Sequence, residues 1–181
     1  MHQETPETII KFWFKNESRW FKKDAQFDEN IRARFQDLWL QAKEGKYAHW
    51  QDTPAGILAL VIIFDQLPRN MFRGGAQMYA TDNNALQLVK AAIINGTDLQ
   101  LESNKQRFCL YMPFMHSEVL ADQEKGIVLF QQVDNHHAVS SAEQHRDIVK
   151  KFGRFPHRNA ILGRTSSAEE LEFLKNPKAH F

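Results

Sequence analysis

Cysteine is nearly absent from this chain of 181 residues, since Cys109 is the only one. A single cysteine excludes an internal disulfide framework and indicates a reducing compartment. Long apolar runs are also missing: the longest, 55–64, has ten residues, and a membrane span needs about 20. The first residues show no basic region followed by an apolar core, so no signal peptide is expected. These absences predict a cytoplasmic protein with no membrane partner.

The sequence also lacks an excess of charge of either sign. Lys and Arg number 23, Asp and Glu number 22, and the formal net charge is +1. A nucleic-acid-binding surface needs a strong positive field, so no nucleic-acid partner is expected. At this length one domain with a buried core, residues 1–181, is the expected organisation.

Several well-known catalytic and cofactor motifs do not occur. The chain has no Gly-x-x-x-x-Gly-Lys, no Gly-x-Gly-x-x-Gly, no nucleophile elbow and no Cys-x-x-Cys. The helical Glu-x-x-His pairs that are typical of di-iron bundles are missing too. No cofactor and no metal site is therefore predicted.

Apolar residues recur at helical spacing almost throughout. One stripe, at steps of four, three and four, is formed by Ile31, Phe35, Leu38 and Ala42. The segment 54–66 is apolar on every side, which is typical of a helix at the centre of a helical fold, and it is expected to end at Pro68. No alternation of period two demands a strand. We predict an all-α fold of about eight helices with short connections, stacked as a solenoid or bundle.

Caps and helix breakers delimit the other predicted helices. These are 82–94 after Thr81, 104–111 before Pro113, 117–133 opened by Ser117, a helix with a capping box at Ser140 and Glu143 that ends at Phe152, and a last helix with a box at Ser166 and Glu169 that ends near Leu174. The segment 134–138 between them is expected to be a loop.

Polar residues gather at two proline corners, 64–74 and 152–164. In the second, Pro156 is expected to begin a helix whose first turn contains His157, Arg158 and Asn159. Unpaired N–H groups and guanidinium forks at such a turn suit a phosphate or carboxylate. The alternative is a buried ion-pair network, in which Arg154, Arg158 and Arg164 pair with Asp65, Glu118 or Glu169.

Histidines supply the other candidate groups. His116 and Glu118 lie together at an expected helix start, where the pair is suited to acid–base work or metal binding, or simply to capping. His145 shares an apolar helix face with Ile148 and Val149. A histidine in that position is more often a hydrogen-bonded core residue than a ligand.

Several longer motifs follow one another along the chain. They are Phe12-Trp13-Phe14, Trp20-Phe21-x-Lys23-Asp24, Asp65-Gln66-x-Pro68-Arg69-Asn70-x-x-Arg73-Gly74, Tyr111-Met112-Pro113-Phe114-x-His116-Ser117-Glu118, and Phe152-Gly153-Arg154-Phe155-Pro156-His157-Arg158-Asn159 with Leu162-Gly163-Arg164. In this order they resemble the bacterial family called domain of unknown function 924, over nearly the whole chain. The resemblance implies a fold similar to tetratricopeptide-repeat helical solenoids, without their repeat consensus, and no established activity. Val119 departs from the pattern, because an acidic residue is expected after Ser-Glu.

The first functional expectation is a binding module for a small anionic ligand or a carboxylate-bearing peptide end. Its ligand-binding residues are predicted to be Arg69, Asn70, Arg73, His116, His145, Arg154, His157, Arg158 and Asn159, with Trp13, Trp20 and Tyr111 as possible walls. This hypothesis requires the arginines to converge without an equal number of carboxylates facing them.

Two alternatives belong to other classes. A hydrolase-type enzyme would use Glu118 or Asp65 as base and His116 or His157 as acid, within hydrogen-bond reach in an open cleft. A protein–protein adaptor would instead present surface aromatics such as Phe21, Trp39 or Trp50. The sequence leaves the ligand, the reaction and the oligomeric state open.

Overall fold

The computed structural model describes residues 4–176, and over this range the fold is all-α without a strand. Its helices are α1 (Pro6–Lys15), α2 (Ala25–Lys43), α3 (Pro54–Val61), α4 (Leu67–Met71), α5 (Asp82–Ile94), α6 (Asn104–His116), α7 (Leu120–Gln132), α8 (His136–Phe152) and α9 (Ala168–Leu174). Because α3 and α4 belong to one continuous rod, these nine helices make eight rods. The predicted fold class is confirmed. The predicted single domain also includes residues 1–3 and 177–181, which lie outside the described residues.

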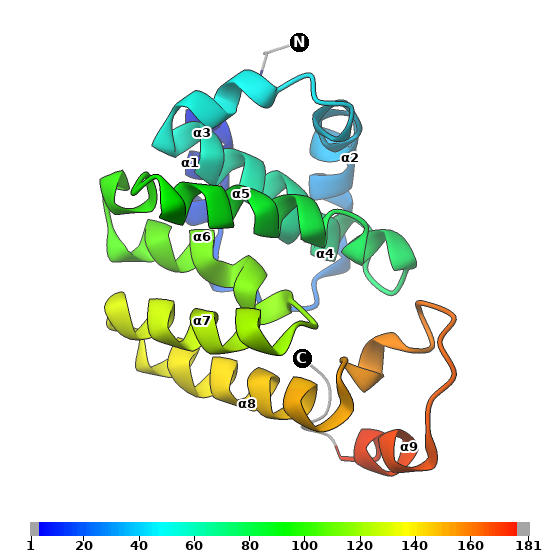
Figure 1. Cartoon of the computed structure of the whole chain (residues 1–181). Coiled ribbons are helices and arrows are strands. Elements are labelled where there is room, and N and C mark those ends of the chain that lie inside the picture. The colour runs from blue at the N-terminus through cyan, green and yellow to red at the C-terminus, as the bar shows by residue number, and fades with distance from the viewer. Residues whose placement is uncertain (1–3, 177–181) are drawn as a thin grey trace.

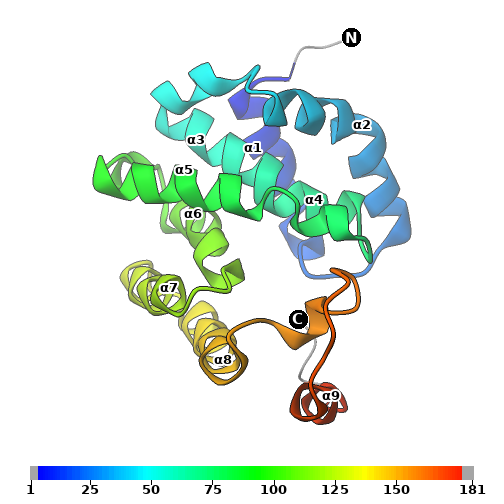
Figure 2. The same ribbon diagram turned by 45° about the vertical axis from the view of Figure 1, so that its right-hand side comes forward.

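The helices are arranged in two groups. Helices α5, α6, α7 and α8 follow one another as neighbours in a stack, and α1 to α4 pack at the α5 end of that stack (Figure 1). The turned view places the segment between α8 and α9 next to α9, below the α3–α4 rod (Figure 2). A tetratricopeptide-like course of the helices stays a prediction. In the described part of the chain, no helix is long and apolar enough to cross a membrane.

The main hydrophobic core lies where these groups meet. Its largest fully buried side chains include Ile9, Trp13, Phe35, Trp39, Leu58, Ile62, Tyr111 and Phe130. A second, smaller core of Ile148, Val149 and Phe155 holds the C-terminal segment. The aromatic adaptor surface is wrong for two of its three members, since Trp39 is 1% exposed and Trp50 is 8% exposed. Burying these large apolar rings stabilises the fold more than exposing them to water would. Of the three aromatic residues, only Phe21 is exposed.

The α3–α4 rod does not end at Pro68, because a π-helical turn at Ile62–Gln66 joins its two parts. Proline has no N–H, so an α-helix would leave the carbonyl four residues earlier, that of Phe64, without a donor. The Thr81 hydroxyl supplies one, donating to the Phe64 carbonyl at 2.6 Å while accepting from the Trp39 indole N–H at 3.1 Å. The predicted stop at Pro68 was wrong because the missing donor comes from a residue distant in sequence.

Two other helix boundaries also differ from the prediction. Helix α6 continues through Pro113 to His116 instead of ending before the proline. Its last turns are buried against the core, so packing outweighs the lost hydrogen bond. Helix α7 begins at Leu120, and the predicted N-cap Ser117 ends α6 instead. The Ser117 hydroxyl donates to Asp122 and accepts from the backbone N–H of Val119.

Four predictions near the C-terminus also need correction. Helix α8 begins at His136, because the Asn135 side chain accepts from the Ala138 N–H and caps it. Only 134–135 of the predicted loop 134–138 therefore lie outside a helix, and no capping box lies at Ser140. The capping box of α9 is formed by Ser167 and Glu170, one residue later than predicted. Pro156 begins only a short 3-10 turn, Pro156–Arg158, which offers no α-helical N-terminus to an anion.

The hydroxyl of Thr81 is expected to contribute strongly to stability. Thr81→Val preserves shape but leaves the Phe64 carbonyl and the Trp39 N–H without partners in the core. An unsatisfied buried group costs about 1–3 kcal/mol, so urea unfolding should show a loss of about 2–4 kcal/mol. The exposed Thr165→Val is the matched control. Equal stability of the two variants would contradict the role given to Thr81.

Candidate functional site

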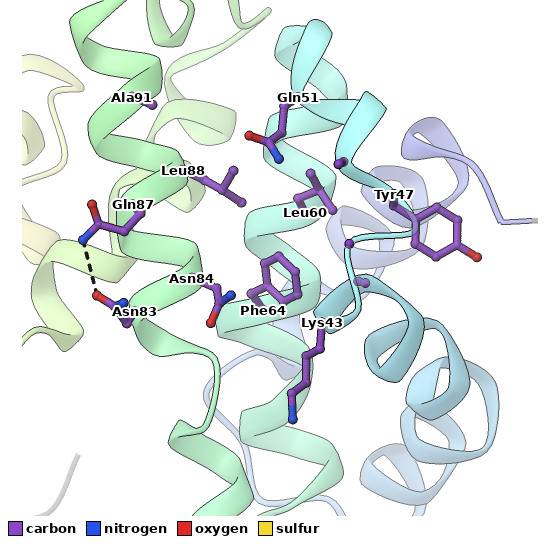
Figure 3. A pocket seen from close by; sticks show the side chains of 13 residues that line it. Lys43, Tyr47, Gln51, Leu60, Phe64, Asn83, Asn84, Gln87, Leu88 and Ala91 are labelled. Atoms are coloured by element: carbon purple, nitrogen blue, oxygen red, sulfur yellow. Dashed lines mark hydrogen bonds between the residues drawn. The ribbon is translucent and has the colours of Figure 1, made fainter.

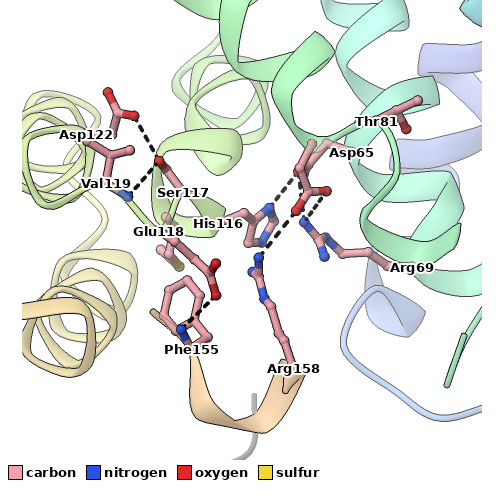
Figure 4. Close-up of polar contacts among 12 residues, drawn as sticks. Asp65, Arg69, Thr81, His116, Ser117, Glu118, Val119, Asp122, Phe155 and Arg158 are labelled. Carbon is pink, nitrogen blue, oxygen red and sulfur yellow. Dashed lines mark hydrogen bonds and ion pairs between the residues drawn. The ribbon is translucent and has the colours of Figure 1, made fainter. Parts of the chain in front are cut away.

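A carboxylate and a histidine from distant segments meet at the centre of the molecule. Asp65 lies on the π-helical turn and is completely buried, and His116 is the last residue of α6, with its side chain 12% exposed. The Asp65 Oδ1 atom lies 2.7 Å from Nδ1 of His116 (Figure 4). The sequence offered this carboxylate and histidine as one of several possible combinations but did not single the pair out.

The charges around the pair fix its protonation. Burial by itself would raise the pKa of Asp65, but His116 and Arg69 hold that pKa far below its usual value. Burial and the nearby Arg69 lower the pKa of His116. At neutral pH the carboxylate is therefore ionised and the imidazole is neutral. An ionised carboxylate only accepts hydrogen bonds, so the proton lies on Nδ1 and the lone pair on Nε2.

Arg69 joins Asp65 to a second carboxylate. One of its nitrogens donates to Asp65 Oδ1 at 3.1 Å and to Asp82 Oδ1 at 3.0 Å. Asp82 is the first residue of α5, so Arg69 binds together the π-helical turn and the start of α5. Burial raises the pKa of Asp82, although Arg69 opposes this effect.

Arg158 approaches the same cluster from the C-terminal segment (Figure 4). It is 7% exposed, and its guanidinium lies 4.5 Å from the ring centroids of both Tyr79 and Phe155. Its Nη1 atom is 3.5 Å from Asp82 Oδ2 without a hydrogen bond, and its Nε has no partner among residues 4–176. Burial and the neighbouring Arg69 lower the pKa of Arg158. This cation is thus less completely neutralised than the others.

The remaining arginines do not converge on the cluster. Arg73 pairs with Asp28 at 2.6 and 3.0 Å, and the Asn70 amide donates to the same carboxylate at 2.7 Å. Arg154 holds Glu170 at 2.7 and 2.8 Å. The expected convergence of Arg69, Arg73, Arg154 and Arg158 without an equal number of facing carboxylates is therefore wrong. Each of these arginines meets a carboxylate, although only Arg69 and Arg158 are largely buried.

Glu118 fastens the C-terminal segment and is not the partner of His116. Its carboxylate accepts from the Phe155 N–H at 2.8 Å and from both terminal nitrogens of Arg164 at 2.7 and 2.9 Å. Burial would raise its pKa, but Arg164 and the Phe155 N–H lower it. Arg164 in turn donates to Asn159 Oδ1 at 2.9 Å. The alternative reading of Arg164 and Glu118 as an ion pair is confirmed.

Two predicted histidines pack on Phe155, the ring that Arg158 also contacts. His145 donates from Nδ1 to the Ser141 carbonyl at 2.7 Å and packs edge-on to Phe155, as expected of a core histidine. His157, on the 3-10 turn, packs against the Phe155 ring at 5.6 Å. The aromatic side chains that were expected to wall the pocket pack within the protein instead. Trp13 and Tyr111 are 1% exposed, and Trp20 stacks on Trp13. Within residues 4–176, no three His, Cys, Asp or Glu side chains converge as metal ligands.

Two residues of the cluster, Asp82 and Tyr79, were not predicted from the sequence. Asp82 was predicted only as the first residue of a helix. An acidic group in a first turn suits the helix dipole, so it gave little indication of a site. Tyr79 lies in a short 3-10 turn, Ala76–Tyr79, and no pattern around it indicated a site. Tyr79 precedes Thr81 and Asp82 follows it, so both lie next to the residue whose hydroxyl donates to the Phe64 carbonyl.

Residues 9–178 match the profile of a bacterial protein family of unknown function, DUF924. The chain belongs to this family. A solved structure of a protein of unknown function from Agrobacterium tumefaciens is similar over 94% of this chain and 96% of that chain, with 41% sequence identity and a TM-score of 0.89. No curated protein matches the chain. The predicted family is thereby confirmed.

The departure from the family pattern at Val119 has a structural explanation. Val119 is 56% exposed and is the N-cap residue of α7, with an extended backbone and no side-chain cap. Figure 4 shows it beyond Ser117, away from Asp65. An acidic residue there could accept from an N–H group at the start of the helix, so we expect an acid at this position to act as a cap.

Val119→Asp is therefore expected to stabilise the protein by about 0.5–1 kcal/mol, because it adds an N-cap and a charge that suits the helix dipole. Urea unfolding of this variant should be compared with Val119→Ala, which cannot cap. Stabilisation by both substitutions, or by neither, would exclude capping as the reason.

His145 should make the protein sensitive to acid. Burial lowers its pKa from 6.5 to about 3, so between these pH values the unfolded chain binds a proton that the folded chain does not. The free energy of unfolding must then fall as the pH decreases through this window. His145→Gln keeps a donor for Ser141, and its stability should fall less between pH 7 and pH 5 in urea unfolding. The exposed His137→Gln serves as control, and parallel curves for all three proteins would refute the assignment.

Proposed function

We propose that this protein is a hydrolase-type enzyme in which His116 is the general base and Asp65 orients it. The observation that carries the proposal is the 2.7 Å bond from a completely buried, ionised carboxylate to Nδ1 of a neutral histidine. Nε2 makes no hydrogen bond to any residue in 4–176, and the side chain is partly exposed. A neutral imidazole held in one tautomer is what a general base requires.

The roles of the two residues differ from those in the enzyme alternative of the sequence, which offered Glu118 or Asp65 as base and His116 or His157 as acid. Asp65 accepts hydrogen bonds from His116, Arg69 and Gln66, and it is out of reach of a substrate. In the proposed step Nε2 takes a proton from water as the oxygen attacks a carbonyl or phosphoryl centre. Asp65 stabilises the imidazolium, which then returns the proton to the leaving group.

Arg158 gives this site its preference for an anionic substrate. Its guanidinium is nearly buried, forms only a long ion pair with Asp82, and has an unpartnered Nε within the described chain. A desolvated guanidinium binds carboxylate or phosphate oxygens strongly. The small anionic ligand of the sequence hypothesis is therefore retained, with Arg158 as its anchor. Binding of such an anion without turnover is the second candidate function.

Activity against chromogenic esters tests the proposal. We expect turnover of p-nitrophenyl phosphate or of the hemisuccinate ester of p-nitrophenol, with a rate that rises with pH through a pKa below 6.5, because the base must be unprotonated. His116→Gln keeps a donor to Asp65 and should lose about 10²–10⁴ in kcat/KM. Arg158→Gln should raise KM for these anionic esters but not for the neutral acetate ester.

His137→Gln is the matched histidine control, and thermal melting checks that each variant is folded. No turnover, combined with melting temperatures raised by phosphate or succinate in the wild type but not in Arg158→Gln, would replace the enzyme with the binding function. Neither turnover nor an anion-induced shift would refute both functions.

A further inference from the structure

A separate cavity lies between α3, α5 and the turn after α2, with a volume of about 480 Å³ (Figure 3). This is within the range of small-molecule and peptide sites, about 300–1,000 Å³. None of the residues assigned to the His116 cluster lines it. It is therefore separate from that cluster.

The lining of the cavity combines an apolar floor with a rim of side-chain amides. Leu60, Phe64 and Leu88 form much of the floor. The carboxamides of the rim belong to Gln51, Asn83, Asn84 and Gln87. The only charged side chain among the lining residues is Lys43, so the cavity favours a ligand with an apolar part, many amide groups and one negative charge.

The carboxamides are available to a ligand. Each offers both donors and an acceptor, which matches the alternating N–H and C=O groups of an extended peptide. Gln51 and Asn84 form no side-chain hydrogen bond within residues 4–176, and Asn83 and Gln87 bond only to one another, at 3.3 Å. Figure 3 shows Gln51 on the wall that faces α5, so a chain between them can be contacted from both sides.

The dimensions suit a short peptide. The contributing face of α5 runs from Asn83 to Ala91, about 12 Å at a rise of about 1.5 Å per residue. An extended chain advances about 3.3 Å per residue, so about four residues span this length. The Lys43 ammonium lies at the Phe64 and Asn84 end of the groove (Figure 3) and over the Trp39 ring.

We propose that this groove binds an extended peptide of about four residues, with an apolar side chain on the floor and a free C-terminal carboxylate at Lys43. This proposal keeps the carboxylate-bearing peptide end expected from the sequence, but it places the carboxylate at Lys43 and not among the arginines. This binding does not depend on the activity proposed for His116.

The groove and the His116 cluster are nevertheless formed in part by consecutive residues of the chain. Phe64 lies in the floor of the groove and the next residue, Asp65, holds His116. In the same way Asp82 bonds Arg69 while the next residue, Asn83, lies at the groove rim. A peptide packed on Phe64 therefore rests against the turn that positions Asp65.

The test is a titration of ¹⁵N-labelled protein with a mixture of tetrapeptides of Ala, Leu, Phe and Gln that have free carboxyl termini. We expect the side-chain amide signals of Gln51, Asn84 and Gln87 to shift. Asn84→Ala should weaken binding about tenfold, since it removes paired hydrogen bonds. The exposed amide Gln131→Ala, outside the groove, is the matched control and should bind like the wild type.

The same peptides with amidated C-termini test the charge. The wild type should prefer the free acids, and Lys43→Met should lose that preference while still binding the amides. No shift at all, shifts confined to signals outside the groove, or equal weakening by Asn84→Ala and Gln131→Ala would overturn the proposal. Because His116 takes no part in this binding, His116→Gln should bind the peptides normally even if it abolishes activity.

Discussion

The burial of one negative charge, that of Asp65, determines how several helix ends meet in this protein. An ionised carboxylate that is removed from water must be given donors, or it becomes very costly. Here the donors come from His116 at the end of α6 and from Arg69 on α4. Arg69 then brings in Asp82 from the start of α5. The polar cluster is thus a structural joint, and the same partners give His116 its neutral, oriented state.

Asp65 can occupy this place because of the π-helical turn before Pro68. A proline within a helix normally costs about 3 kcal/mol or more through a lost bond and a clash. The Thr81 hydroxyl replaces the lost donor on the Phe64 carbonyl, and the wider turn relieves the backbone. A π-helical turn of this kind is frequent at functional sites. In this chain it presents Phe64 to a groove and Asp65 to a histidine.

The arginines illustrate how architecture and chemistry share residue types. Arg73, Arg154 and Arg164 each hold a carboxylate in two-pronged geometry, and they tie the α4 end and the C-terminal segment to the body. Arg158 differs in its surroundings. Its aromatic neighbours, Tyr79 and Phe155, shield it from water, while its carboxylate partner is 3.5 Å away and neutralises its charge only in part. That contrast between full and partial neutralisation separates a fastening residue from a candidate ligand anchor.

Helical periodicity and composition determined the all-α class, and motif order determined the family, because both depend on residues that are near one another in sequence. Caps and helix breakers placed the helix of 82–94 correctly. They failed at Pro68, where a distant hydroxyl replaces the missing donor, at Pro113, where burial in the core continues the helix, and at Ser140, where Asn135 caps the helix earlier. Among the candidates, Asp65, His116 and Arg158 could be named from the sequence. Their grouping, the loss of Arg73 and Arg154 to other partners, and the recruitment of Asp82 and Tyr79 could not. Pairing among charged groups depends on distances across the fold, and only the packed tertiary structure sets those distances.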